Sequence, residues 1–351
     1  MSPSITTREP RLDRDRLIRE LVPPPRFDAE RFSTYRPDPA QPSQAATVRR
    51  LEEYAAGLGA AAGNGAGAPR AVPGRWWRRL GAKQEAGKGV YLDGGFGVGK
   101  THLLASLWHE APGPKAFGTF VELTNLVGAL GFAQTVEALQ GHRLVCIDEF
   151  ELDDPGDTVL MSTLLTRLSE AGVALAATSN TLPGALGEGR FAAEDFLREI
   201  QALSARFDVL TVDGEDYRHR GLAPSPPPLS DEEVAARVVE AGGLCDHFVD
   251  VTRHLATVHP SRYRALLDGV TAVGWQHVRP VSDQMVALRL VVLADRLYDA
   301  DIPVFASGHP LGDIFTPELM RGGYRKKYFR AVSRLTALAR EGVGEVAHGQ
   351  G

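Results

Sequence analysis

The chain has little cysteine, no long hydrophobic run and no excess of positive charge. Only two of its 351 residues are cysteines, which excludes a disulfide framework and favours a reducing compartment. A run of about 18 apolar residues is lacking, as is a signal-peptide pattern, so we expect a cytoplasmic protein. The formal net charge of -5 argues against binding nucleic acid through overall positive charge.

The histidines also lack the spacing of a metal site. His247, His254, His259 and His277 do not recur at ligand spacing on one predicted element. We therefore expect no metal site built from histidine or cysteine.

Composition divides the chain into segments of different character. With 43% hydrophobic residues, the chain can bury a real core. Dense prolines before residue 45 predict an extended segment, or one that wraps a folded body, and good helix formers predict a helix over 45–58. The expected parts are an N-terminal extended segment and helix (1–58), a Gly/Ala-rich linker (59–74), an α/β domain (75–222), a mainly helical smaller domain (223–345) and a tail (346–351).

Strand-like and helix-like runs alternate from Gly89 to about Val212. This alternation predicts a parallel sheet covered by helices. Ser230 is the expected N-cap of the helix that opens the smaller domain. The expected strands are "GVYLD", "AFGTFV", "LVCID", "VALAATS" and "VLTV", and the helices between them include "THLLASLWHE" and "TVLMSTLLTRLSEAG".

Eight residues at a strand-to-helix junction match the pattern G-x-x-x-x-G-K-[ST]. Backbone N–H groups of such a loop surround a polyphosphate, Lys100 would reach the β- and γ-phosphates, and the Thr101 hydroxyl would bind Mg²⁺. An ordinary glycine-rich turn is the alternative, but the position after "VYL" and before "THLLASL" is the one a phosphate loop requires. The absent side chains would then make room for phosphate. The predicted nucleotide-binding residues are Gly94, Gly95, Phe96, Gly97, Val98, Gly99, Lys100, Thr101 and, in the first helical turn, His102.

Two carboxylates follow the apolar run that ends at Ile147. Acids at the carboxyl end of a buried central strand lie where α/β proteins bind ligands. Asp148 would hold the Mg²⁺, and Glu149 would polarise the attacking water. An exposed acidic turn is the alternative. Asn180 ends the next strand and could orient that water or touch the γ-phosphate, although "SNTLP" is also turn-like.

The order of these motifs resembles an AAA+ ATPase, and more closely the ZapE and AFG1-like ATPase family. The resemblance implies a P-loop sheet core with a mainly helical C-terminal lid and a Mg-dependent ATPase that remodels a protein partner. It implies ATP and Mg²⁺ bound through Gly94, Gly99, Lys100 and Thr101, hydrolysis by Asp148 and Glu149, and Asn180 as a sensor. The matching stretches are "YRPDPAQPSQAATVRRLEEY", "KGVYLDGGFGVGKTHLLASLW", "LVCIDEFELDDPGDTVLMSTLLTRLSEAGVALAATSN" and "VLTVDGEDYRHR".

The same resemblance implies arginines that act on the nucleotide. Arg190 is the first choice for an arginine finger that reaches a neighbouring subunit, and Arg198 is the second. Arg206 is a further alternative, although we expect it next to the last strand. Arg334 could sense the γ-phosphate from the lid. For each arginine the alternative is a solvated helix face.

By resemblance the partner is the cell-division machinery, notably FtsZ, with a homo-oligomer when ATP is bound and peripheral contact with the membrane. A helicase-loader-like ATPase is a second possibility, because "RWWRR" and "RGGYRKKYFRAVSR" mix cations with aromatic residues. The net charge of -5 argues against this second possibility. A slow ATP-gated adaptor is a third possibility, and Glu149 argues against that one.

Overall fold

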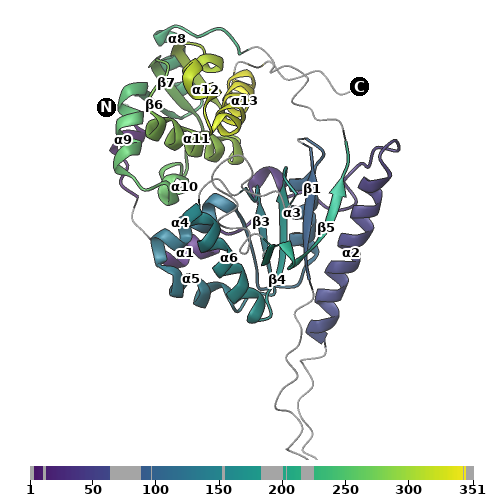
Figure 1. Cartoon of the computed structure of the whole chain (residues 1–351). Helices are drawn as coiled ribbons and strands as arrows, with labels where there is room; N and C mark the ends of the chain where they lie inside the picture. Colours follow the sequence, from purple (N-terminus) through teal and green to yellow (C-terminus); the bar gives the residue numbers. More distant parts are fainter. Residues whose placement is uncertain are drawn as a thin grey trace, which may run out of the picture. The chain divides into compact units, whose positions relative to one another are not determined.

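The computed structural model describes residues 4–10, 13–63, 88–95, 97–151, 155–182, 201–202, 204–214, 225–342 and 344. Its contacts divide the chain into two compact units (Figure 1). The five-stranded unit consists of residues 14–23 and 27–219, and the three-stranded unit consists of residues 1–13, 24–26 and 220–351.

The five-stranded unit contains the predicted parallel sheet. Its strand order is β2-β3-β4-β1-β5, and every neighbouring pair is parallel. Since all carboxyl ends of the strands share one edge, the residues that follow them are brought together there. The strands are β1 (Gly89–Gly94), β2 (Lys115–Thr119), β3 (Leu144–Asp148), β4 (Ala174–Ser179) and β5 (Phe207–Val212).

Helices cover both faces of this sheet, as Figure 1 shows. Side chains alternate along β1, so Val90 and Leu92 enter one core with α2 and α3, whereas Tyr91 enters the other with α4 and α6. The resulting three-layer arrangement is the one that the alternating sequence pattern predicts. The helices are α1 (Arg14–Arg19), α2 (Pro42–Gly63), α3 (Lys100–Glu110), α4 (Phe120–Leu130), α5 (Phe132–Leu139) and α6 (Pro155–Glu170).

Two predicted boundaries in this unit differ from the structure. Helix α2 continues to Gly63, so the beginning of the predicted linker is helical, and the rest of that linker lies outside the described residues. Strand β2 ends at Thr119 instead of continuing to Val121. Thr119 Oγ1 accepts a hydrogen bond from the Glu122 N–H, and the Glu122 carboxylate accepts one from the Thr119 N–H. This capping box starts α4 directly after the strand.

The three-stranded unit is mainly helical, as predicted, but it also contains a sheet that the sequence analysis missed. The sheet has the order β6-β7-β8, and both pairs are parallel. Ser230 caps α8 as predicted, since its Oγ accepts from the Glu233 N–H at 3.2 Å. The main elements are α8 (Asp231–Glu240), β6 (Leu244–His247), α9 (Phe248–Thr257), α10 (Tyr263–Leu266), β7 (Val273–Val278), α11 (Gln284–Asp299), β8 (Val304–Gly308), α12 (Pro317–Arg321) and α13 (Arg325–Gly342).

The main core of this unit lies on one face of its sheet. Val273 and Trp275 of β7 pack there with residues of α9, α11 and α13. On the opposite face α8 lies close to the sheet, and a Cβ at Gly274 would meet Val238 Cγ2 at 2.5 Å. The glycine therefore permits α8 to pack directly on β7.

The proline-rich N-terminal segment packs against folded parts of the chain, which is the second of the two predicted alternatives. In the three-stranded unit, Ile5 is buried and its N–H donates to Asp246 Oδ2 at 2.9 Å. In the five-stranded unit, the Leu21 carbonyl accepts from the Phe117 N–H of β2 at 2.8 Å. None of the helices in the described ranges is long and apolar enough to cross a membrane.

Candidate functional site

The predicted phosphate loop connects β1 to α3 at the carboxyl edge of the five-stranded sheet. Gly97 and Gly99 have φ values of 81° and 86°, in the left-handed region where a side chain is strained. The loop leads directly into α3 at Lys100, so backbone N–H groups at the helix N-terminus face the position where a phosphate is expected. Phe96, also predicted to bind nucleotide, lies outside the described residues.

At two of the glycines, the structure gives a reason for the absent side chain other than room for phosphate. A Cβ at Gly94 would lie 2.3 Å from the Val212 carbonyl oxygen of β5, and a Cβ at Gly99 would lie 2.6 Å from Tyr35 Cε2. The protein itself therefore fills the space beside these two residues. Room for phosphate, the predicted reason for all of these absent side chains, therefore explains them only in part.

Lys100 joins the loop to the end of β4. Its side chain is buried, and Nζ donates to the carbonyl oxygens of Gly94 (2.9 Å) and Gly95 (2.5 Å) and to Asn180 Oδ1 (2.9 Å). Burial raises the pKa of the nearby Asp93 carboxyl, and the Lys100 ammonium partly offsets this rise. The ammonium is thus held at the mouth of the loop by three oxygen atoms from two strand ends.

Thr101 and Asp148 are also brought together. Thr101 Oγ1 donates to the Asp148 carboxylate, at 3.0 Å from Oδ2 and 3.2 Å from Oδ1. A hydroxyl and a carboxylate are hard oxygen donors, and Mg²⁺ is usually held by one or two carboxylates together with substrate phosphates. The donor set therefore fits Mg²⁺. The described residues contain no group of three or more His, Cys, Asp or Glu side chains arranged to hold a metal by themselves.

A threonine that the sequence analysis missed orients both acids. Thr178 of β4 is buried, its Oγ1 donates to Asp148 Oδ1 at 2.5 Å, and the same oxygen accepts from the Glu149 N–H at 3.1 Å. Glu149 has φ 52°, an unusual conformation for a residue with a side chain, and such strain is concentrated at functional sites. A hydroxyl within the apolar run "VALAATS" is the signal that points to this residue.

Asn180 lies between the phosphate loop and the acids. Because β4 pairs with β1 on one side and with β3 on the other, the residue that follows β4 is between Lys100 and Asp148. Asn180 Nδ2 also approaches Glu151 Oε1 at 3.4 Å. This arrangement agrees with the expectation that Asn180 lies beside the Asp148 strand.

The first turn of α3 is bound to the N-terminal segment. His102 Nδ1 lies 3.1 Å from Glu30 Oε2, and its Nε2 lies 3.1 Å from Thr34 Oγ1 and 3.0 Å from the Arg31 carbonyl oxygen. The predicted nucleotide-binding residue His102 is therefore a structural link in this unit.

Of the three candidates for the arginine finger, the structure describes only Arg206. Arg190 and Arg198 lie outside the described residues. Arg206 directly precedes β5, and its carbonyl oxygen accepts from the Gly89 N–H at 2.8 Å. Gly89 begins β1, so Arg206 lies at the sheet edge opposite the phosphate loop of its own chain.

Arg334, the predicted lid arginine, is part of an ion-pair cluster in the three-stranded unit. Its Nη1 lies 2.5 Å from Asp295 Oδ1, and Arg330 Nη2 lies 2.9 Å from the other oxygen of that carboxylate. Burial by itself would raise the pKa of Asp295, but the two guanidinium groups outweigh it and hold the pKa below its usual value. The Arg334 guanidinium also lies 5.1 Å from the ring centroid of Tyr298.

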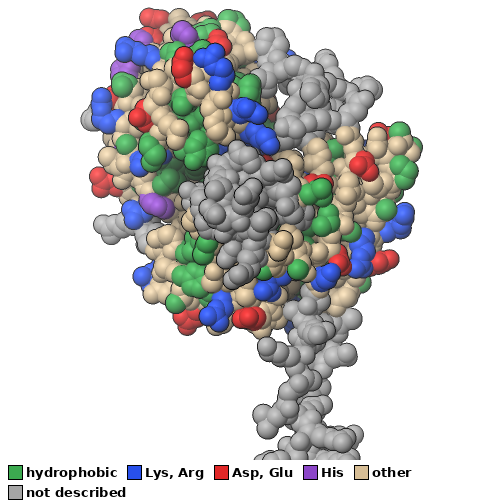
Figure 2. All heavy atoms as spheres, viewed as in Figure 1, with side chains coloured by type: hydrophobic (Ala, Val, Ile, Leu, Met, Phe, Trp, Pro, Cys, Tyr) green, Lys and Arg blue, Asp and Glu red, His purple; other side chains and the backbone are tan. Residues whose placement is uncertain are grey.

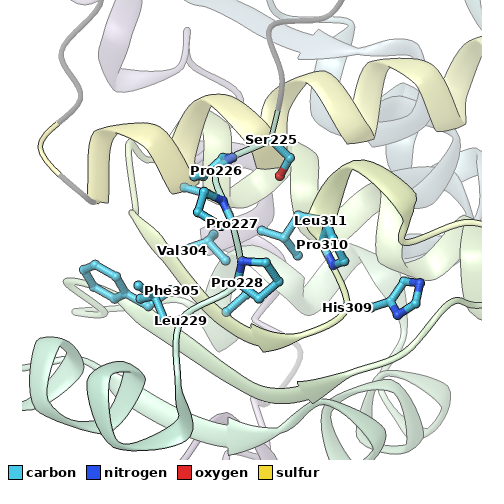
Figure 3. A pocket seen from close by; sticks show the side chains of 12 residues that line it. Ser225, Pro226, Pro227, Pro228, Leu229, Val304, Phe305, His309, Pro310 and Leu311 are labelled. Carbon is cyan, nitrogen blue, oxygen red and sulfur yellow. The ribbon is translucent and has the colours of Figure 1, made fainter.

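The three-stranded unit also has a small apolar pocket, which Figure 3 shows. Pro227 and Pro228 line it together with Phe305 of β8, and its interior has room for about 20 Å³. This volume corresponds to about one water molecule, so the pocket is too small for a nucleotide.

Together, the glycine-rich loop, the buried lysine and the acid-bearing strand beside it define a P-loop nucleotide-binding protein with a parallel sheet core. A family model described as "AFG1-like ATPase" matches residues 21–227 and 222–344. The chain belongs to the AFG1-like ATPase family.

Curated relatives include a bacterial division protein. The chain is 33% identical to cell division protein ZapE of Escherichia coli (strain K12) over 172 residues, which is 45% of this chain and 46% of the relative. It is 29% identical over 150 residues to an uncharacterized protein of Schizosaccharomyces pombe, which covers 37% of this chain and 33% of that one. The chain thus spans less than half the length of the curated relatives it matches.

Two solved structures are also similar in part. DnaI is 17% identical with a TM-score of 0.42, over 56% of this chain and 97% of that chain. AMPPCP-bound DnaA from Aquifex aeolicus is 10% identical with a TM-score of 0.38, over 69% of this chain and 63% of that chain.

Proposed function

We propose that the protein hydrolyses ATP with Mg²⁺ and couples hydrolysis to the remodelling of a protein partner. The observation that carries the proposal is that two pairs meet at one sheet edge: Lys100 with Asn180, and Thr101 with Asp148. The first pair places a cation and an amide where the γ-phosphate is expected, and the second pair offers oxygen ligands to Mg²⁺.

Each side chain has a distinct role in this proposal. Lys100 binds the β- and γ-phosphates, Thr101 and Asp148 hold the metal ion, and Glu149 accepts a proton from the attacking water. Mg²⁺, when bound, supplies positive charge against the phosphate oxygens. Asn180 orients the water or the γ-phosphate. The hydrogen bond from the Glu149 N–H to Thr178 holds the backbone of Glu149 at the strand end.

The site is completed by a neighbouring copy of the chain. An arginine finger stabilises charge on the transferred phosphoryl group, and Arg190 is our first candidate, with Arg198 and Arg206 as alternatives. Arg334 is the candidate γ-phosphate sensor, which would require it to exchange its ion pair with Asp295 for one with phosphate.

The partner that we propose belongs to the cell-division machinery, with FtsZ as the first candidate and peripheral contact with the membrane. The support is the similarity to a relative whose name is cell division protein ZapE. A pull-down from dividing cells that recovers no division protein with the ATP-bound chain would count against this assignment.

Steady-state ATPase measurement at increasing protein concentration tests the proposal. Wild-type turnover per subunit should rise with concentration, because the finger comes from a second copy. Glu149→Gln should lower kcat by about a hundredfold or more and retain ATP binding. Glu137→Gln, an exposed position of α5, is the matched control and should behave like the wild type. ATP binding without turnover in the wild type would leave a slow ATP-gated adaptor instead of a motor.

A second candidate function, action on single-stranded nucleic acid, has one supporting observation. Figure 2 shows Lys and Arg side chains gathered over α13. Arg325 and Lys326 are exposed there, and Phe329 is 46% exposed beside them. Exposed aromatic rings among cations suit base stacking and phosphate pairing. Stimulation of ATPase by single-stranded DNA, lost in Arg325→Ala with Lys326→Ala, would favour this candidate over the first.

A further inference from the structure

A tyrosine of the N-terminal segment packs directly on the phosphate loop. Tyr35 donates a hydrogen bond from its hydroxyl to the Val98 carbonyl oxygen at 2.8 Å. Its ring lies so close to Gly99 that a Cβ at this glycine would be 2.6 Å from Tyr35 Cε2. Tyr35 therefore contacts both residues of one loop peptide, the peptide that joins Val98 to Gly99.

Contacts on both sides hold Tyr35 in place. The ring of His102 lies edge-on to the Tyr35 ring, with centroids 5.4 Å apart, and His102 is itself bound by residues 30–34. Further along the chain, Gln44 Oε1 accepts from the Asp38 N–H and Gln44 Nε2 donates to the Asp213 carbonyl oxygen at 2.7 Å. Asp213 directly follows β5, so the segment is anchored to the sheet edge that carries the loop.

We propose that Tyr35 is a positioning residue of the nucleotide site, which fixes the orientation of the Val98–Gly99 peptide for binding phosphate. In a planar trans peptide, the C=O and the N–H point in opposite directions. Because the Val98 carbonyl is directed at Tyr35, the Gly99 N–H is directed away from it and stays available to a phosphate oxygen. This inference rests on the proposed nucleotide function of the loop.

This fixed orientation of the peptide lowers the entropy cost of binding phosphate. A glycine-rich loop has wide backbone freedom, and a peptide that is already oriented loses less conformational entropy when phosphate arrives. Desolvation by burial raises the pKa of Tyr35 to about 12, so the hydroxyl stays protonated at neutral pH and keeps its role as donor.

The test compares Tyr35→Phe with Tyr54→Phe in the full chain. Tyr35→Phe keeps the ring on Gly99 and removes only the hydrogen bond to Val98. Tyr54 of α2 is the matched control, because its hydroxyl also donates to a backbone carbonyl of the same unit, that of Leu175 at 3.3 Å, without contacting the loop. ATP–Mg²⁺ affinity is measured by equilibrium titration, and kcat and KM by steady-state ATPase.

We expect Tyr35→Phe to raise the Kd for ATP–Mg²⁺ by about fivefold to tenfold, the effect of one hydrogen bond, and to raise KM similarly. Its kcat should stay within about twofold of the wild-type value, because the hydrogen bond is the same before and during the chemical step. Tyr54→Phe should leave Kd, KM and kcat unchanged. Both variants should lose a similar amount of thermal stability, since each loses one tyrosine-to-carbonyl hydrogen bond.

Amide hydrogen exchange of the nucleotide-free protein provides a second measurement. Exchange in the segment that contains Gly99 should be faster in Tyr35→Phe than in the wild type and in Tyr54→Phe. Equal Kd and equal exchange in Tyr35→Phe and the wild type would overturn the positioning role while the proposed function stands. A wild-type chain that binds no ATP would overturn the proposed function, and the positioning role with it.

Discussion

Lys100 and Asn180 are 80 positions apart in the chain, and Lys100 Nζ donates a 2.9 Å hydrogen bond to Asn180 Oδ1. The contact exists because β4 lies directly beside β1, so the loop that follows one strand meets the residue that follows the other. It links the lysine of the predicted phosphate loop to the amide beside the acids. A change at Asn180 should therefore affect the chemical step more than folding.

Asn180→Ala removes this amide. We expect kcat to fall by about a hundredfold, as when one preorganised hydrogen-bonding group is lost at a reacting centre, while the Kd for ATP changes by no more than a few fold. Steady-state ATPase and equilibrium nucleotide binding measure the two effects. Asn125→Ala, on α4 and outside the site, is the matched control. An unchanged kcat in Asn180→Ala would leave Asn180 as an ordinary turn residue.

Thr178→Val tests the residue that orients both acids. The substitution removes the donor to Asp148 and the acceptor of the Glu149 N–H, so a buried carboxylate and a partly buried N–H each lose a partner. We expect the free energy of unfolding to fall by about 2–3 kcal/mol, and kcat to fall as well. Urea unfolding and ATPase assays measure these effects. Thr178→Ser keeps the hydroxyl and should recover most of kcat; failure of this recovery would show that the methyl group matters and the hydrogen bonds do not.

Gly94→Ala tests the reason for the first glycine of the loop. Its new Cβ would lie 2.3 Å from the Val212 carbonyl oxygen, so β1 and β5 must separate. We expect a loss of about 1–3 kcal/mol in the free energy of unfolding without any nucleotide. Gly128→Ala in α4 is the control, because nothing lies within 4 Å of its Cβ. This variant should gain up to about 1 kcal/mol from helix propensity. Equal stability of the two variants would contradict the steric reason.

Asp295→Asn removes the negative charge shared by Arg330 and Arg334. The carboxylate side chain is only 17% exposed, so its loss removes a shared counter-charge from two partly buried guanidinium groups. We expect the free energy of unfolding to fall by about 3 kcal/mol. Asp250→Asn is the control, since Asp250 forms an exposed ion pair with Arg253 and should contribute less than about 1 kcal/mol. Equal losses in the two variants would show that burial does not strengthen the cluster.

The same carboxylate predicts a pH dependence of stability. The pKa of Asp295 is lower in the folded protein than its ordinary value, so ionised Asp295 stabilises the fold above the pKa of the unfolded chain, near pH 4. This stabilisation is lost as the pH falls below that value and through the folded-state pKa. The difference in unfolding free energy between the wild type and Asp295→Asn should therefore be constant from pH 6 to 7 and shrink below pH 4. A difference that stays constant down to pH 3 would contradict the ion-pair cause.

Much of the five-stranded unit was predictable, because its signals are local. The spacing of the glycines, Lys100 and Thr101 identifies a phosphate loop from a short stretch of sequence, and the apolar run before Asp148 identifies a buried strand. Thr178 and Tyr35 were missed for the opposite reason. A threonine in a strand and a tyrosine in a proline-rich segment have no local pattern that names their partners, which are 30 and 63 positions away.

In the three-stranded unit, too, local sequence patterns did not reveal every element and contact. Strand β6 has four residues and β7 has six, and both lie among strongly helical patterns, so their short runs carry little information of their own. Asp295 and Arg334 are each typical of a helix surface, and only the packing of α11 beside α13 makes them an ion pair.

By itself, the sequence determined the phosphate loop, the order of strands and helices around it, the acids at the end of β3 and the cap at Ser230. These features depend on residues within one or two turns or strands of each other. The tertiary structure alone decided which residues surround the loop: Val212 beside Gly94, Tyr35 on Gly99 and Asn180 on Lys100. Parallel strands pair only through long crossovers, so the residues that share their carboxyl edge are distant in the chain, and it is packing of the whole unit that brings them together.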